Sequence, residues 1–67
     1  MKRENAIRDV NIRIEHLARL EPQYRLNRVE EYNTLRSGII DSIRTHSINV
    51  RQELEPHVYN LYRRYFD

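Results

Sequence analysis

The chain has 67 residues, 33% of them charged, and a formal net charge of +2 at pH 7. A core of this size rarely supplies more than about 3–5 kcal/mol, so we expect a single domain that gains stability from oligomerisation. The absence of cysteine excludes disulfides and thiolate metal sites, and no apolar run is long enough for a membrane span. We therefore predict a cytoplasmic protein with no cofactor and no membrane contact.

Basic residues are concentrated in the N-terminal part of the chain. Residues 1–28 carry seven Lys or Arg and four acids, whereas residues 29–67 carry five and six. Of the 12 basic residues 11 are Arg, whose planar guanidinium suits phosphate and the guanine edge. This bias is compatible with nucleic-acid binding, and an ordinary solvated surface of Arg and Glu is the alternative.

Residues 1–9 are mostly polar and charged, which predicts a basic, flexible arm. The next five residues, 10–14, alternate three β-branched apolar side chains with Asn11 and Arg13. Alternation with a period of two predicts a strand with its apolar residues on one face and Asn11 and Arg13 on the other. Because one strand cannot form a sheet, this strand implies a partner strand from a second chain.

A helix is the alternative for the same segment. Apolar residues recur there at the a and d spacing of an amphipathic helix, at Ile7, Val10, Ile14 and Leu17. In that case residues 4–20 are helical, Ile12 is a single exposed apolar residue, and the protein is an all-α three-helix bundle.

The middle of the chain predicts two helices. Pro22 suits a first turn, so a regular helix is expected to begin near residues 21–22, with a single kinked helix as the alternative. Asn33 and Thr34 predict a junction in which Thr34 caps the next helix. Gly38 either weakens that helix or marks the close approach of another backbone.

Residues 49–67 predict a C-terminal helical extension. Asn49 is an N-cap candidate with Gln52 three residues later, and Pro56 bends the chain or restarts the helix. Apolar residues then follow at helical spacing, at Val58, Leu61, Tyr62 and Tyr65. This spacing favours packing on the domain, on a second dimer or on a partner protein over stacking of the aromatic rings on bases.

Two segments resemble the ribbon–helix–helix family of dimeric DNA-binding proteins, the Arc-type repressors in particular. The first is Val10-Asn11-Ile12-Arg13-Ile14, which is similar to the family's alternating strand. The second is Thr34-Leu35-Arg36-Ser37-Gly38-Ile39-Ile40-Asp41-Ser42-Ile43-Arg44, which resembles the start of the family's second helix. The resemblance implies a homodimer that is mainly α with one short N-terminal strand, and a ribbon–helix–helix core over residues 10–48.

The resemblance also assigns roles to individual residues. An antiparallel ribbon in the major groove presents to the base edges Asp9, Asn11 and Arg13. Phosphate contacts come from the arm and from the start of the second helix, at Lys2, Arg3, Arg8, Thr34, Leu35, Arg36 and Ser37. The dimer core then consists of Val10, Ile12, Ile14, Ile39 and Ile43.

These assignments predict a sequence-specific binder of double-stranded DNA, a small dimeric transcriptional repressor. The alternative is a small helical protein–protein interaction or inhibitor module that binds no nucleic acid. An enzyme is not expected, because the single glycine excludes a glycine-rich phosphate loop and no serine has the context of a nucleophile. A metal site is not expected either, because His16, His46 and His57 have no short-range pairing.

Overall fold

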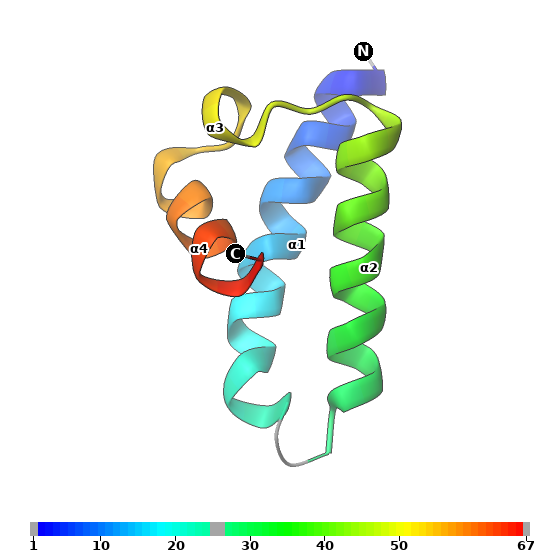
Figure 1. Ribbon diagram of the computed structural model, residues 1–67, viewed down its shortest axis with the longest axis vertical. Coiled ribbons are helices and arrows are strands. Elements are labelled where there is room, and N and C mark those ends of the chain that lie inside the picture. Colours follow the sequence, from blue (N-terminus) through cyan, green and yellow to red (C-terminus); the bar gives the residue numbers. More distant parts are fainter. Residues whose placement is uncertain (1, 25–26, 67) are drawn as a thin grey trace.

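The structure, a computed structural model, describes residues 2–24 and 27–66 (Figure 1). The described part contains helices and no strand: α1 (Lys2–Tyr24), α2 (Val29–Thr45), α3 (Val50–Glu53) and α4 (Pro56–Phe66). Helices α1 and α2 lie side by side and antiparallel, and α4 packs against α1 (Figure 1). None of the described helices is both long and apolar enough to cross a membrane.

The strand predicted for residues 10–14 is wrong, because these residues lie inside α1. Val10 and Ile14 are fully buried, whereas 57% of Ile12 is exposed. Burial follows the helical spacing over the whole helix, at Ala6, Val10, Ile14, Leu17 and Leu20. A strand would have left its backbone N–H and C=O groups without partners in this chain, whereas the helix pairs them internally. The all-helical alternative is the correct one.

The core lies within one chain. Val10 and Ile14 of α1 pack with Ile39 of α2 and Val58 of α4, all four fully buried, and half-buried Ile43 packs against them. The residues assigned to a dimer core therefore form the core of a single molecule, except for Ile12, which faces solvent. Residues 2–9, expected to form an arm, are the first turns of α1, and Ala6 is buried there.

Neither of the helix starts predicted for the middle of the chain is present. Helix α1 runs through Pro22 and ends at Tyr24, so the proline lies in its last turn. The single-helix alternative is therefore the correct one, and the proline removes one backbone hydrogen bond near the end of that helix. Helix α2 begins at Val29 and includes Asn33 and Thr34, so the predicted junction is wrong.

Helix α2 ends in a Schellman motif. The N–H of Ile48 donates to the carbonyl of Ile43 at 3.0 Å, and the N–H of Ser47 donates to the carbonyl of Arg44 at 3.3 Å. Ser47 has a φ of 50°, in the left-handed region that favours glycine. Ile48 follows and is buried, so the turn delivers an apolar side chain to the core.

Helices α3 and α4 begin where the sequence predicts. The side chain of Asn49 accepts a hydrogen bond from the N–H of Gln52 at 3.2 Å, which confirms Asn49 as an N-cap. The reciprocal hydrogen bond of this cap involves the residue after Gln52. The carboxylate of Glu53 accepts a hydrogen bond from the N–H of Asn49 at 2.7 Å. Pro56 is the first residue of α4, where its missing N–H costs nothing.

Replacing Ser47 with glycine should stabilise the protein. Ser47→Gly relieves a left-handed residue and should raise the free energy of unfolding by about 1 kcal/mol in urea denaturation. The matched control is Ser37→Gly, at an exposed position inside α2, which should lower the same quantity by about 0.5 kcal/mol. Destabilisation by both substitutions would contradict the assigned turn.

Candidate functional site

Arg3 holds three parts of the chain together. Its guanidinium forms a two-pronged ion pair with the carboxylate of Glu53 on α3, with Nη2 2.6 Å from Oε2. Nη2 also donates to the carbonyl of Ser47 at 3.0 Å, and Nε donates to the carbonyl of His46 at 3.2 Å. Arg3 was assigned to a DNA phosphate, and its donors are instead engaged within the fold.

The Arg3–Glu53 pair changes the pKa of both groups. Hydrogen bonds from Arg3, and then from the N–H of Asn49, hold the pKa of Glu53 below its usual 4.5. The same ion pair raises the pKa of Arg3. Because Glu53 also closes the N-terminal turn of α3, its ionised form secures that short helix to the start of α1.

Asn11 is the one buried polar residue that the described part of the chain contains, and 8% of it is exposed. Its Nδ2 donates to the carbonyl of Ile7 at 3.0 Å, and its Oδ1 accepts from the N–H of Glu55 at 3.2 Å. The N–H of Glu55 precedes α4 and has no partner within that helix, so Asn11 supplies one. Asn11 therefore positions α4 and does not face outward, as base reading would require.

Arg36 joins α2 to the end of α4. Its Nε donates to the carbonyl of Tyr65 at 3.4 Å, and its guanidinium carbon lies 5.0 Å from the centroid of the Phe66 ring. Phe66 in turn stacks on Tyr62 with ring centroids 4.8 Å apart and an interplanar angle of 11°. This arrangement combines a cation–π contact with a hydrogen bond to one of the last carbonyls of a helix.

The other predicted site residues fall into two groups. Thr34, Leu35 and Ser37 lie inside α2, where their backbone amides are used by the helix, so the predicted phosphate clamp at a helix start is not formed. Five more lie exposed on α1, at Lys2, Arg8, Asp9, Ile12 and Arg13. The structure therefore does not gather the predicted base-reading and phosphate-binding residues on one surface.

Gly38 faces α1 rather than a second backbone. A Cβ atom at Gly38 would lie 3.7 Å from Nη1 of Arg13, an ordinary van der Waals contact. Arg13 thus lies along the side of α2 that faces α1. Arg36, two residues before Gly38, contacts α4. Residues two positions apart point to different sides of a helix, so α2 contacts Arg13 of α1 on one side and Phe66 of α4 on another.

The side of α2 that carries Arg36 continues into a partly exposed apolar surface. Val29 and Ile40 are seven residues before and four residues after Arg36, and this spacing places them on the same helix face. Val29 is 45% exposed, and Ile40 is half-buried without belonging to the described side chains that pack on the core. On α4, Tyr62 and Phe66 are half-buried and pack against the core, and Phe66 also contacts Arg36. We call these five residues the α2–α4 face: Val29, Arg36, Ile40, Tyr62 and Phe66.

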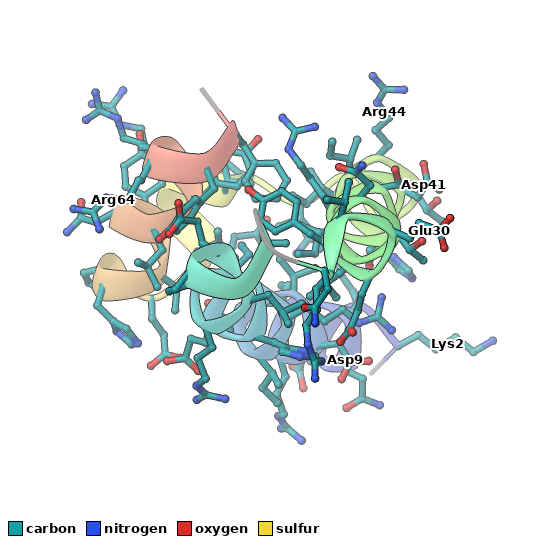
Figure 2. The ribbon with its side chains drawn as sticks, turned by 90° about the horizontal axis from the view of Figure 1, so that it is seen from below. Lys2, Asp9, Glu30, Asp41, Arg44 and Arg64 are labelled. Carbon is teal, nitrogen blue, oxygen red and sulfur yellow. The ribbon has the colours of Figure 1, made fainter. Side chains whose placement is uncertain are left out.

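Figure 2 shows how the helices that carry this face, α2 and α4, are placed relative to α1. Seen along the bundle, α4 and α2 lie on either side of α1, and side chains, including aromatic rings, fill the space between them. No described helix lies over this space on the side away from α1. The sequence pattern identified the apolar stripe of α4 but not this face, because the contact between Arg36 and Phe66 joins residues that are 30 positions apart.

Titratable side chains in the described part of the chain bear on two questions, metal binding and the pairing of helices. There, no group of three His, Cys, Asp or Glu side chains could hold a metal ion. The titratable pair between α1 and α4, His57 Nε2 and Glu15 Oε2 at 2.9 Å, lies on the surface and joins the two helices.

The chain was compared with protein-family models, curated proteins and solved structures, and none of them matches it. The surface itself therefore carries the functional argument.

The role of Asn11 can be measured through stability. Asn11→Ala removes the acceptor for the N–H of Glu55 and should lower the free energy of unfolding by about 1–2 kcal/mol. Asn5→Ala, at an exposed position of the same helix, is the control and should leave stability unchanged or slightly raised. Equal effects of the two substitutions in urea denaturation would show that Asn11 does not hold α4.

The Arg3–Glu53 pair should make stability depend on acid pH. A carboxyl whose pKa is lower in the folded than in the unfolded protein stabilises the fold above the unfolded pKa. That stability is lost as the pH falls from about 4.5 through the folded pKa of Glu53. Glu53→Gln should therefore lower the free energy of unfolding at neutral pH. It should also make this free energy fall less steeply as the pH drops below the pKa that Glu53 has in the unfolded protein.

The control for this pH dependence is Glu30→Gln, which removes an exposed carboxylate on α2. In this variant the free energy of unfolding should fall with decreasing pH as it does in the wild-type protein, measured by circular dichroism at each pH. A decline of the same size in Glu53→Gln would show that the ion pair does not stabilise the fold.

Proposed function

We propose that this protein is a small helical interaction module that binds a partner protein through the α2–α4 face. The observation that carries the proposal is the combination on this face of exposed Val29 and half-buried Ile40 with a cation–aromatic cluster. Val29 is 45% exposed, and Arg36 lies over the Phe66 ring beside Tyr62. Aromatic residues and arginine are the types that contribute most to binding energy in protein interfaces.

The rigidity of this cluster also supports the proposal. Arg36 is held by the carbonyl of Tyr65, and Phe66 is held between Arg36 and Tyr62. Side chains that are ordered before binding lose less conformational entropy when a partner covers them. The α2–α4 face is therefore better suited to a partner than the exposed Ile12, which is a single apolar residue among charged neighbours.

Binding of double-stranded DNA is the second candidate, and it requires a different surface from a two-stranded ribbon. Besides Arg3, which is paired with Glu53, four basic residues of α1 are exposed: Lys2, Arg8, Arg13 and Arg19. Arg8 and Arg19 are 11 residues, or about three turns, apart and so lie on one side of the helix, where a helix in the major groove would meet phosphates. The acids Glu4 and Asp9 are exposed on the same helix and weaken its attraction to phosphate.

One photocrosslinking experiment separates the two candidates. A p-benzoylphenylalanine in place of Ile40 samples the α2–α4 face, and the same group in place of Ile12 samples the outer face of α1. Irradiation in the cells that naturally make the protein should give a discrete protein adduct from position 40 and none from position 12.

The other outcomes are equally informative. Adducts with nucleic acid from position 12 would favour the DNA-binding candidate, and an adduct with a second copy of the chain from position 40 would show that the face joins two protomers. If position 40 gave no adduct above the background of position 12, the proposed function would be wrong.

A further inference from the structure

We propose that two copies of the chain exchange the segment that contains α3 and α4, residues 50–66, which we call the α3–α4 segment. In the exchanged dimer this segment of each copy packs on α1 and α2 of the other. The partner is a second copy of this chain, and the interface is the one that each chain otherwise forms within itself. The exchange goes beyond the proposed function and does not depend on a partner at the α2–α4 face.

The turn between α2 and α3 is strained. Ser47 lies in this turn with a φ of 50°, in the left-handed region where a Cβ atom causes strain. The strain is released when the turn opens and residue 47 becomes part of a helix. Short connections under strain favour the exchange of segments between identical chains, because the contacts of the segment are formed again with the second copy.

The sequence across the turn allows α2 to continue as a helix. Residues 39–55 contain neither glycine nor proline. The apolar stripe of α2 also continues in phase across the turn. Its members follow at intervals of four, seven and four residues: Ile39, Ile43, Val50 and Leu54. A helix that runs from α2 through α3 therefore keeps its apolar residues on one side.

The polar groups of the turn have partners in both arrangements. Arg3 donates to the carbonyls of His46 and Ser47, which follow the last residue of α2. In a continued helix these two carbonyls accept from the N–H groups four residues further along the chain. Opening the turn therefore leaves no carbonyl without a partner, and it releases Arg3 to pair with Glu53 of a second copy.

The α3–α4 segment is held to α1 by contacts that a second copy can supply unchanged. Arg3 pairs with Glu53, and Asn11 accepts from the N–H of Glu55. Val58 is fully buried in the core that α1 helps to form. All of these contacts join α1 to residues beyond the turn, so they are equally available within one chain and between two chains. An exchanged dimer contains the whole set twice.

Ile48 opposes the exchange. It is buried directly after the turn, and in a continued helix it would point away from the apolar stripe. The short connection also favours the closed turn, because it holds the segment at a high effective concentration next to its own α1. We therefore expect the monomer to dominate in dilute solution and the exchanged dimer to form at about millimolar protein.

The first test looks for contacts between chains. Protein at about 1 mM is unfolded in urea, refolded and compared by sedimentation with protein refolded at about 10 µM, and we expect a dimer at the higher concentration. A sample refolded from a mixture of ¹³C-labelled and unlabelled chains should show nuclear Overhauser effects between Val58 of one copy and the buried apolar residues of α1 in the other. A dimer without these effects, or a monomer at both concentrations, would overturn the proposal.

Substitutions at Ser47 should shift the balance in opposite directions. Ser47→Gly relieves the left-handed residue and disfavours a continued helix, so it should raise the dissociation constant of the dimer at least about tenfold. Ser47→Ala keeps a Cβ atom in the turn and favours the helix, so it should lower this constant about fivefold, since each dimer contains two turns. Equal dissociation constants of the two variants would show that the turn does not open.

Charge reversal tests the exchange with two different chains. Arg3→Glu and Glu53→Arg each place like charges at positions 3 and 53, both within one chain and in an exchanged dimer of identical chains. In an exchanged dimer with one chain of each kind, opposite charges meet at both contacts. We expect the equimolar mixture, and neither variant alone, to give a dimer in native mass spectrometry and the helical circular dichroism of the wild type.

The matched control carries Arg3→Glu and Glu53→Arg in one chain, which restores opposite charges within that chain. It should fold alone and dimerise as the wild type does. If the equimolar mixture of the single variants behaves as the sum of its two components, the segment does not dock on a second copy and the proposal is wrong.

Discussion

The hydrogen bond from the N–H of Glu55 to Asn11 determines where α4 lies. Helix α4 has 11 residues, too few to be stable alone in water, so its stability and its angle come from contacts with α1. Val58 supplies burial but no direction, whereas the Asn11 bond fixes one backbone group at the start of the helix. From that point the chain carries Tyr62 and Phe66 to Arg36, so the α2–α4 face depends on a polar group inside the core, together with the surface pair of His57 and Glu15.

Part of the fold follows from local sequence rules, and the exceptions lie where two signals compete. The helical spacing of Val10, Ile14 and Leu17 predicts the helix in which all three side chains are buried. Asn49 likewise predicts the start of α3. The alternation of apolar and polar residues at positions 10–14 favours a strand instead. It covers a shorter stretch of the chain than the helical spacing does. Thr34 resembled an N-cap, yet α2 starts at Val29 without any side-chain cap. Tertiary packing therefore overrode a good local signal.

The candidate site could be predicted far less well, because the roles of its arginines depend on distant residues. Arg3 pairs with Glu53 and Arg36 contacts Phe66, separations along the chain that no local pattern reports. Arginine links two helices at these positions, whereas Arg8 is an exposed cation. Composition treats them alike, and the resemblance to ribbon–helix–helix proteins assigned Arg3 and Arg36 to phosphate without regard to these contacts.

The link between Arg3 and Glu53 has a consequence for the order of folding. The two residues are 50 positions apart, so their pairing closes a loop that contains both α1 and α2. Closing a long loop costs chain entropy, whereas α1 and α2 are sequence neighbours and can pair over a short connection. We therefore expect the α1–α2 hairpin to form before the α3–α4 segment docks. A ligand that bridges α2 and α4 would bind the docked form alone, and its binding free energy would be added to the stability of the last segment to fold.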